Sequence, residues 1–175
     1  LSREVRFIAF SLEEEDLLGS LAYVSSLKKV GHEIDGAIVL ECVGYTCATE
    51  GSQRKPAGVS IVVPTVGDFL AIVGNTASAA LVAAVEGAAK ERVPDLKTVA
   101  LTVPGNGELV PDTRRSDHAA FWHYGYPAVM LTDTANFRNP NYHASTDTIE
   151  TLDLGFMEKV ARTITATVTH LCANP

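Results

Sequence analysis

Short apolar, β-branched runs alternate with amphipathic stretches along the whole chain, and this alternation restricts the fold more than any other feature. Strands that alternate with helices are typical of an α/β domain whose sheet is covered on both faces. The predicted strands are 5–10, 34–40, 69–73, 98–103 and 128–131, and the predicted helices are about 17–30, 77–91, 116–124 and 152–171. We therefore expect residues 1–175 to form a single domain, a three-layer α/β/α sandwich with a mostly parallel mixed sheet.

The composition is that of a globular domain, with 46% hydrophobic and 20% charged residues. The formal net charge is −7 and the basic residues are scattered, which argues against nucleic acid or an anionic membrane as a partner. No apolar run approaches the roughly 18 residues that a transmembrane helix needs. The three cysteines are too few for a disulfide framework. A Cys42–Cys47 disulfide and free thiols both remain open.

Acidic residues and a histidine follow the predicted strands at the points where ligands gather in α/β sheets. Glu13 and Glu14 come after the first strand, and Glu41 ends the second. His143 lies in the loop after the strand 128–131. Because loops at the carboxyl edge of a sheet lie close together, we expect these side chains to converge. Carboxylate oxygens with an imidazole nitrogen form a ligand set that zinc accepts.

Each of these residues also has an alternative interpretation. Glu13 and Glu14, taken alone, favour an acidic helix N-terminus over a catalytic pair. Glu41 follows an apolar run, where a carboxylate needs a metal or an ion pair with an arginine, and both remain open. His143 alone is typical of a surface histidine. As a metal ligand it would need a partner for its other ring nitrogen, and the candidates are Asp147 and the Ser116-Asp117-His118 turn.

Five short motifs follow one another along the chain. They are 7–20 with the Glu-Glu pair, 40–45, 116–121 with Ser-Asp-His, 125–128, and 142–148 with Tyr-His. In this order they resemble the motifs of the co-catalytic zinc aminopeptidases of metallopeptidase family twenty-eight. That family also includes glutamate carboxypeptidases and is related to the glutaminyl cyclases. The resemblance covers the whole chain, and ordered motifs are far more specific together than singly.

The resemblance implies a fold like that of the zinc exopeptidases and a site with two zinc ions. Glu13 would be the general base, Glu14 and His143 would bind one zinc ion, and Glu41 would bind the other. The implied substrate is a peptide with a free N-terminus. Further residues that would support the metal or contact the substrate are Ser116, Asp117, His118, Arg138, Tyr142 and Asp147.

The chain departs from the family pattern in two places. The family has a histidine and a metal-bridging aspartate before the Glu-Glu strand, and residues 1–12 contain neither. We expect that an N-terminal segment of the same domain is missing from this sequence and is needed to complete the site. We favour this explanation over a natural variant that has lost zinc binding. An isolated chain would then expose an apolar sheet edge and be poorly soluble. Some relatives have a tyrosine just before Ser-Asp-His that this chain lacks, and Arg114, Arg115 or Arg138 could supply positive charge instead.

The leading hypothesis is a zinc-dependent exopeptidase of the aminopeptidase type. A non-catalytic module that keeps the peptidase fold for binding or dimerisation is the first alternative. A one-zinc acyl transferase similar to glutaminyl cyclase is the second. The compartment is left open, with a secreted or periplasmic location slightly favoured over the cytoplasm.

Overall fold

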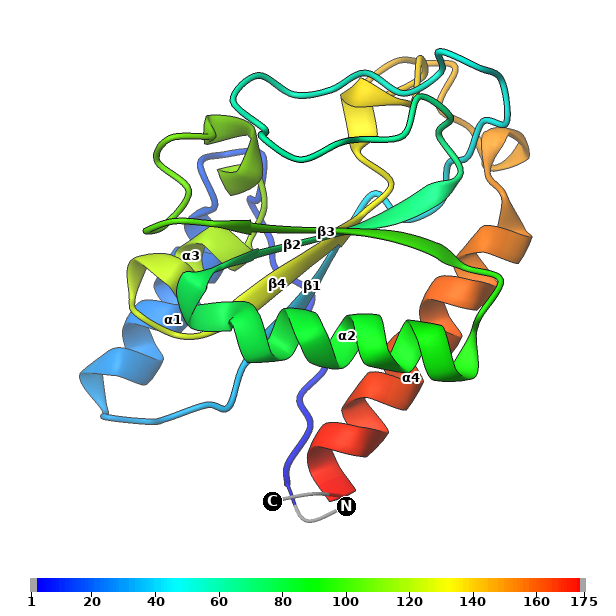
Figure 1. Cartoon of the computed structure of the whole chain (residues 1–175). Coiled ribbons are helices and arrows are strands. Elements are labelled where there is room, and N and C mark those ends of the chain that lie inside the picture. The colour runs from blue at the N-terminus through cyan, green and yellow to red at the C-terminus, as the bar shows by residue number, and fades with distance from the viewer. Residues whose placement is uncertain (1–2, 174–175) are drawn as a thin grey trace.

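The computed structural model describes residues 3–173, which form one mixed sheet between two layers of helices (Figure 1). Within these residues the sheet has four strands in the order β1-β4-β2-β3. The outer pairs, β1 with β4 and β2 with β3, are parallel, whereas β4 and β2 run antiparallel in the centre. The expected mixed, mostly parallel sheet is therefore confirmed. The strands are β1 (Ala37–Glu41), β2 (Phe69–Asn75), β3 (Lys97–Val103) and β4 (Ala128–Thr132).

Helices cover both faces of the sheet, as the alternating pattern predicts. α2 and α4 pack against each other on one face, and α1 and α3 pack together on the other (Figure 1). The α-helices are α1 (Leu18–Lys29), α2 (Ala79–Arg92), α3 (His118–His123) and α4 (Leu154–Ala173). Short 3-10 turns occur at Thr76–Ser78, Pro111–Arg114, Ala135–Phe137 and Ile149–Thr151.

The central strand β4 supplies side chains to both cores because successive strand residues point to opposite faces. Val129 and Leu131 pack in the core beneath α2 and α4. Ala128 and Met130 pack in the other core, which includes Trp122 of α3. Every residue of β4 is buried, which explains its continuous apolar sequence.

The N-terminal segment corrects one prediction from the sequence. Residues 5–10 do not form a strand, and most of their side chains are exposed, with Phe7 95% accessible. Only Phe10 reaches a core, where its ring packs on Tyr23 and Phe121. An apolar, β-branched run forms a strand only when a neighbouring strand supplies hydrogen bonds. Within residues 3–173 the outer edge of β1 has no such neighbour.

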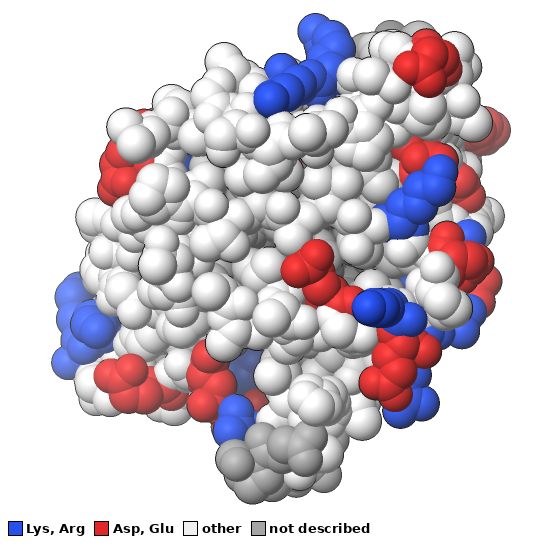
Figure 2. Space-filling model, viewed as in Figure 1, with Lys and Arg blue, Asp and Glu red and all other residues white. Residues whose placement is uncertain are grey.

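The surface offers no concentrated basic patch on the face shown in Figure 2. Charged side chains there are scattered around a broad uncharged area. Among the helices of residues 3–173, none combines the length and apolar character that crossing a membrane requires.

The fold predicts that replacing two leucines, which are register partners in β1 and β4, lowers the free energy of unfolding by unequal amounts. Leu131 is 0% exposed and its register partner Leu40 is 51% exposed. We expect Leu131→Ala to lower the free energy of unfolding by about 2–5 kcal/mol, because it leaves a cavity in the core. Leu40→Ala should cost about 1 kcal/mol or less. Urea unfolding of both variants measures the difference, and equal losses would contradict the assigned burial.

Candidate active site

Two residues that are 129 positions apart meet at the carboxyl edge of β1 and β4. His143 Nε2 lies 2.8 Å from Glu14 Oε1, and both side chains are more than half exposed to solvent. Glu14 comes from the turn before α1, and His143 comes from the loop after β4. The structure therefore brings together two of the predicted metal ligands.

The Glu13-Glu14 pair lies in a tight turn, not at the start of a helix. Leu17 N–H donates to Glu13 O at 2.9 Å, and Leu12 and Leu17 both have positive φ values. α1 begins at Leu18 and has no acidic residue in its first turn, so the interpretation as a helix N-terminus is not supported. Strained φ angles of non-glycine residues concentrate at functional sites.

Glycine at position 19 allows this turn to pack directly on α1. A Cβ atom there would lie 2.1 Å from the carbonyl oxygen of Ser11. Residue 19 therefore has to be glycine for the backbone before the Glu-Glu pair to approach the helix so closely.

Glu41 ends β1 at the same edge and is half-buried. The Cys42 thiol donates to Glu41 Oε1 at 3.2 Å. No arginine forms an ion pair with Glu41 in the part of the chain that the structure describes, so the predicted alternative of a buried ion pair is not supported. Cys42 has a φ of 47°, which turns the chain sharply after the carboxylate.

The neighbouring carboxylates at this edge act electrostatically on Glu13. The pKa of Glu13 is raised to about 7, first by burial and then by the charges of Glu41, Glu14 and Asp117. Like charges that are crowded together favour the protonated form or a bound cation. Burial and the neighbouring charges therefore increase the fraction of Glu13 that is protonated near neutral pH.

The donor types match zinc, but the set is partial. Imidazole nitrogen and carboxylate oxygens are zinc ligands, and Glu14 and His143 are already within contact distance. Among residues 3–173, no three His, Cys, Asp or Glu side chains come together closely enough to hold a metal ion. The residues present therefore fit zinc in kind, and a closed site would need further donors.

Tyr142 orients the histidine by stacking. Its ring lies 4.0 Å from that of His143 with an interplanar angle of 14°. Burial raises the pKa of the Tyr142 hydroxyl, the charges of Glu14 and Glu41 raise it further, and Arg115 opposes them. Tyr142 therefore lies among the acidic groups of the site.

The predicted partners of the histidine ring lie elsewhere. Within residues 3–173, neither Asp147 nor Asp117 donates to or accepts from the His143 ring. Asp147 is exposed, and its backbone N–H donates to Ala144 O. Asp117 acts electrostatically on Glu13, and its Oδ1 atom is buried without a hydrogen-bond partner.

The Ser116-Asp117-His118 motif mainly supports the core. Ser116 is 1% and His118 0% exposed. His118 Nε2 lies 2.7 Å from Thr113 O, and its ring packs edge-on against Trp122. The contacts of His118 are those of a core residue.

The three candidate arginines have different environments. Arg138 is buried, donates to Gln53 Oε1 and Tyr45 O, and lies over the ring of Phe69. Burial lowers the pKa of Arg138 to about 10. Arg114 is exposed. Only Arg115 lines a pocket together with Glu41, so it is the arginine available to a ligand there.

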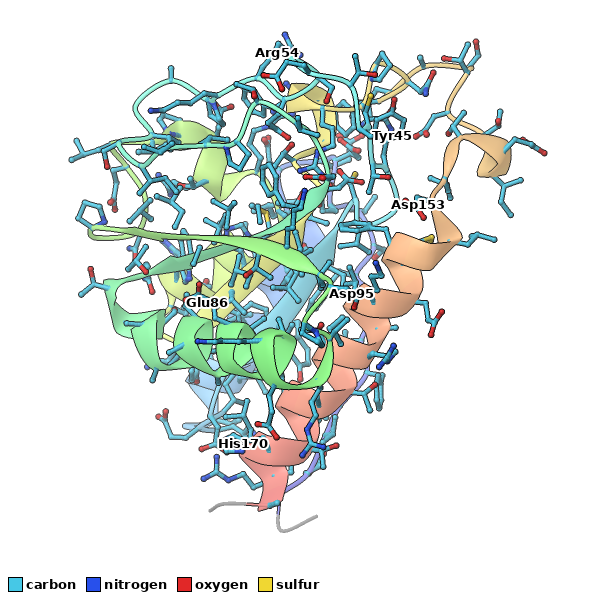
Figure 3. All side chains as sticks on the ribbon, turned by 45° about the vertical axis from the view of Figure 1, so that its right-hand side comes forward. Tyr45, Arg54, Glu86, Asp95, Asp153 and His170 are labelled. Atoms are coloured by element: carbon cyan, nitrogen blue, oxygen red, sulfur yellow. The ribbon has the colours of Figure 1, made fainter. Side chains whose placement is uncertain are left out.

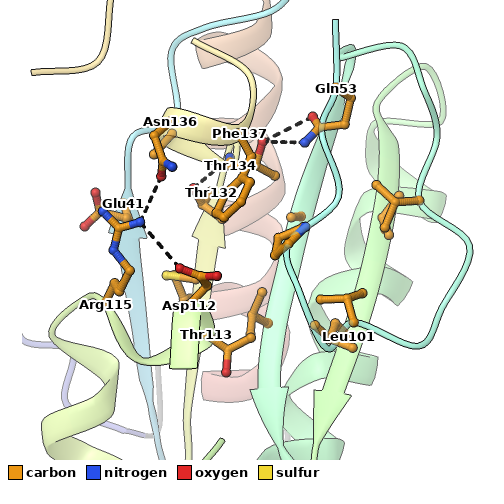
Figure 4. Close-up of a pocket in the computed structure, with 18 of the residues that line it drawn as sticks. Glu41, Gln53, Leu101, Asp112, Thr113, Arg115, Thr132, Thr134, Asn136 and Phe137 are labelled. Atoms are coloured by element: carbon orange, nitrogen blue, oxygen red, sulfur yellow. Dashed lines mark hydrogen bonds and ion pairs between the residues drawn. The ribbon is translucent and has the colours of Figure 1, made fainter. Parts of the chain in front are cut away.

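An apolar pocket of about 100 Å³ opens beside Glu41 and Tyr142 (Figure 4). Its floor is the sheet face of β2, β3 and β4, and its wall is the segment 53–63. Arg115 Nη1 lies 2.9 Å from Asn136 Oδ1 and 3.7 Å from Asp112 Oδ1 at the polar side of the pocket (Figure 4). Apolar lining residues include Val59, Ile61, Val73, Leu101 and Met130.

The sequence did not lead us to predict Asp133 as a site residue, nor the position of Arg115 at the pocket. Asp133 directly follows β4 and is buried at the same edge as Glu41. The rule that drew attention to Glu41, a carboxylate at a strand end, applies equally to Asp133. The cysteines are free thiols, so the Cys42–Cys47 disulfide is absent.

The fold is similar to part of two solved structures from Legionella pneumophila. The structure of the LapA aminopeptidase from Legionella pneumophila matches with a TM-score of 0.68 and 17% sequence identity, over 97% of this chain and 39% of that chain. LapB from the same organism matches with a TM-score of 0.69 and 19% identity, over 96% of this chain and 39% of that chain. At this level of identity, the similarity establishes the fold.

Residues 1–168 match peptidase family M28, and the chain belongs to this family. It is also 33% identical to the uncharacterized protein YfbL of Escherichia coli (strain K12) over 173 residues. That match covers 95% of this chain and 50% of YfbL, so the chain spans about half the length of its curated relative.

The buried His118 predicts an acid-sensitive contribution to stability. Burial lowers its pKa to about 4, whereas an unfolded histidine titrates near 6.5. The unfolded chain therefore binds the proton more readily, and the contribution is present above about pH 6.5 and lost as the pH falls toward 4. Urea unfolding from pH 7 to 4 should show a loss up to about 3 kcal/mol larger in the wild type than in His118→Gln.

The matched control is His123→Gln, which replaces an exposed histidine at the end of the same helix. Its unfolding should follow the wild-type pH dependence. An identical pH dependence in the wild type and His118→Gln would contradict the assigned environment of His118.

Proposed function

We propose that the protein is a zinc-dependent exopeptidase of the aminopeptidase type, which removes N-terminal residues from peptides. The contact between Glu14 and His143, beside Glu13 and Glu41 on the fold of an M28 peptidase, is the observation that carries the proposal. Because the chain spans about half of YfbL, the activity is proposed for the natural full-length protein.

Each acidic residue has a role that suits its position. Glu14 and His143 would hold one zinc ion and Glu41 the other, and bound zinc supplies a water that ionises near neutral pH. Glu13 lies beside the ligand Glu14 without being assigned to either zinc ion, so its carboxylate is suited to accept a proton from that water. The same carboxyl group can then give that proton to the leaving amine.

The acidic cluster also favours the proposed substrate. Asp117, which acts electrostatically on Glu13 and has no role in the proposed metal or proton steps, is the carboxylate left to attract a peptide's free α-amino group. Opposite charges attract strongly where water is partly excluded. A cationic N-terminus is therefore held more favourably here than an internal peptide segment, which supports an exopeptidase in preference to an endopeptidase.

The role of Glu13 can be tested directly. In the natural full-length protein, Glu13→Gln should lower turnover of leucyl p-nitroanilide by about 10²–10⁴-fold, because the proton acceptor is lost. Zinc content, measured by atomic emission, should stay at the wild-type value. Glu15→Gln replaces an exposed neighbour and serves as the control.

Unchanged turnover in Glu13→Gln would rule out Glu13 as the base. A wild-type protein that holds no zinc would instead support the non-catalytic module. Ring closure of N-terminal glutaminyl peptides, without hydrolysis of leucyl substrates, would support the cyclase-like alternative.

The apolar pocket leads to a prediction of side-chain preference. It lies next to Glu41 and Tyr142, where the first side chain of a bound peptide would enter. Burial of about three additional carbon atoms should make kcat/KM for leucyl substrates about 10- to 100-fold higher than for alanyl substrates. Glutamyl substrates should be poorer than both.

Leu101→Phe narrows the pocket and should reduce the leucyl-to-alanyl ratio of kcat/KM. Leu109→Phe makes the same change at a residue that is 78% exposed and should leave the ratio unchanged. Equal ratios in the two variants would show that the pocket does not receive the substrate.

A further inference from the structure

Asp133 is a buried carboxylate that accepts hydrogen bonds from backbone amides of two separate segments. Its side chain is 2% exposed. Oδ2 accepts hydrogen bonds from Gly44 N–H at 3.1 Å and Tyr45 N–H at 2.7 Å. Oδ1 accepts one from Ala135 N–H at 2.9 Å. One side chain therefore ties the segment after β1 to the segment after β4.

Only a carboxylate satisfies these partners. All three are donors, so both oxygen atoms must accept, whereas an asparagine at this position would present an N–H group to at least one of them. Burial raises the pKa of Asp133, and the amide donors and the Arg138 guanidinium oppose this effect. A buried charge is costly, so a carboxylate at this position indicates a specific requirement for three acceptor bonds.

These bonds act on the residue next to Glu41. In the parallel pairing of β1 and β4, Glu41 lies opposite Thr132, so Cys42 and Asp133 leave the sheet side by side. Asp133 N–H donates to Cys42 O at 2.6 Å. Together with its carboxylate bonds, Asp133 fixes the backbone on the C-terminal side of Glu41.

The same residue also begins the segment that leads to His143. Ala135, held by Oδ1, has a φ of 45°, and Thr134 before it has a φ of 76°. Such left-handed conformations persist only when their surroundings hold them. Loss of the Asp133 hydrogen bonds would therefore leave both the backbone next to Glu41 and the loop of His143 less firmly fixed.

We propose that Asp133 is a positioning residue, which holds Glu41 and the His143 loop in the arrangement that binds zinc. It contacts neither the metal nor the substrate. The inference rests on the proposed function and adds to it a residue outside the expected ligand and base set.

The test compares Asp133→Asn with Asp153→Asn in the natural full-length protein. Asp153 accepts hydrogen bonds from Phe156 N–H at 2.9 Å and Thr46 Oγ1 at 2.6 Å. Figure 3 places it at the start of α4, below Tyr45. It therefore anchors the same loop to a helix but does not join the ends of β1 and β4, which makes it a matched control.

Competition with a zinc chelator measures zinc affinity, and unfolding of the metal-free protein measures stability. Asp133→Asn should bind zinc about 10- to 100-fold more weakly, the usual effect of losing an outer support of a metal site. Asp153→Asn should bind zinc as the wild type does, even if the two variants lose similar stability. At saturating zinc, Asp133→Asn should recover turnover with an unchanged KM.

Three results would overturn the inference. Wild-type zinc affinity in Asp133→Asn would do so while leaving the proposed function intact. Equal weakening in both variants would reduce Asp133 to a general structural role. Absence of zinc from the wild type itself would overturn both the inference and the proposed function. If Asp133→Asn does not fold, Asp133→Ser, which introduces a smaller side chain, is compared with Asp153→Asn in the same way.

Discussion

The parallel pairing of β1 with β4 is the constraint on which the candidate site depends. Its register places Glu41 opposite Thr132, so both strands end at the same level of one edge. The chain after β4 then turns back over that edge and carries His143 to Glu14. A slip of one residue would turn every side chain of β1 to the opposite face of the sheet. The buried residues of β4, packed in two cores, prevent such a slip.

The antiparallel pairing of β4 and β2 places the apolar pocket at this same edge of the sheet. Because β2 and β3 run opposite to β1 and β4, the long segment before β2 arrives at the edge where Glu41 ends its strand. That segment forms one wall of the apolar pocket beside the acidic cluster. A fully parallel sheet would have placed it at the other edge. The mixed topology therefore sets an apolar pocket next to a group of carboxylates.

The sequence predicted the architecture well where local patterns decide it, and less well where distant partners decide it. The buried strand 69–73 and the helices around it follow from apolar periodicity and were correctly predicted. Residues 5–10 have the same apolar character, but a strand also needs a hydrogen-bonding neighbour, which composition cannot reveal. In the site, strand ends indicated Glu41 and the loop of His143. The same rule could have drawn attention to Asp133, but its hydrogen bonds to amides that are 88 and 89 positions away follow only from the fold.

The crowded negative charges at this edge of the sheet favour a bound cation. Glu41, Glu14 and Asp117 all act on Glu13 and raise its pKa, and His143, which contacts Glu14, opposes them. The most direct measurement is a crystal structure of the natural full-length protein grown with zinc, with anomalous data at the zinc edge. The account predicts zinc density bound by Glu14 and His143, with a second zinc ion bound by Glu41. Zinc density elsewhere, with Glu14 and His143 still bonded only to each other, would contradict it.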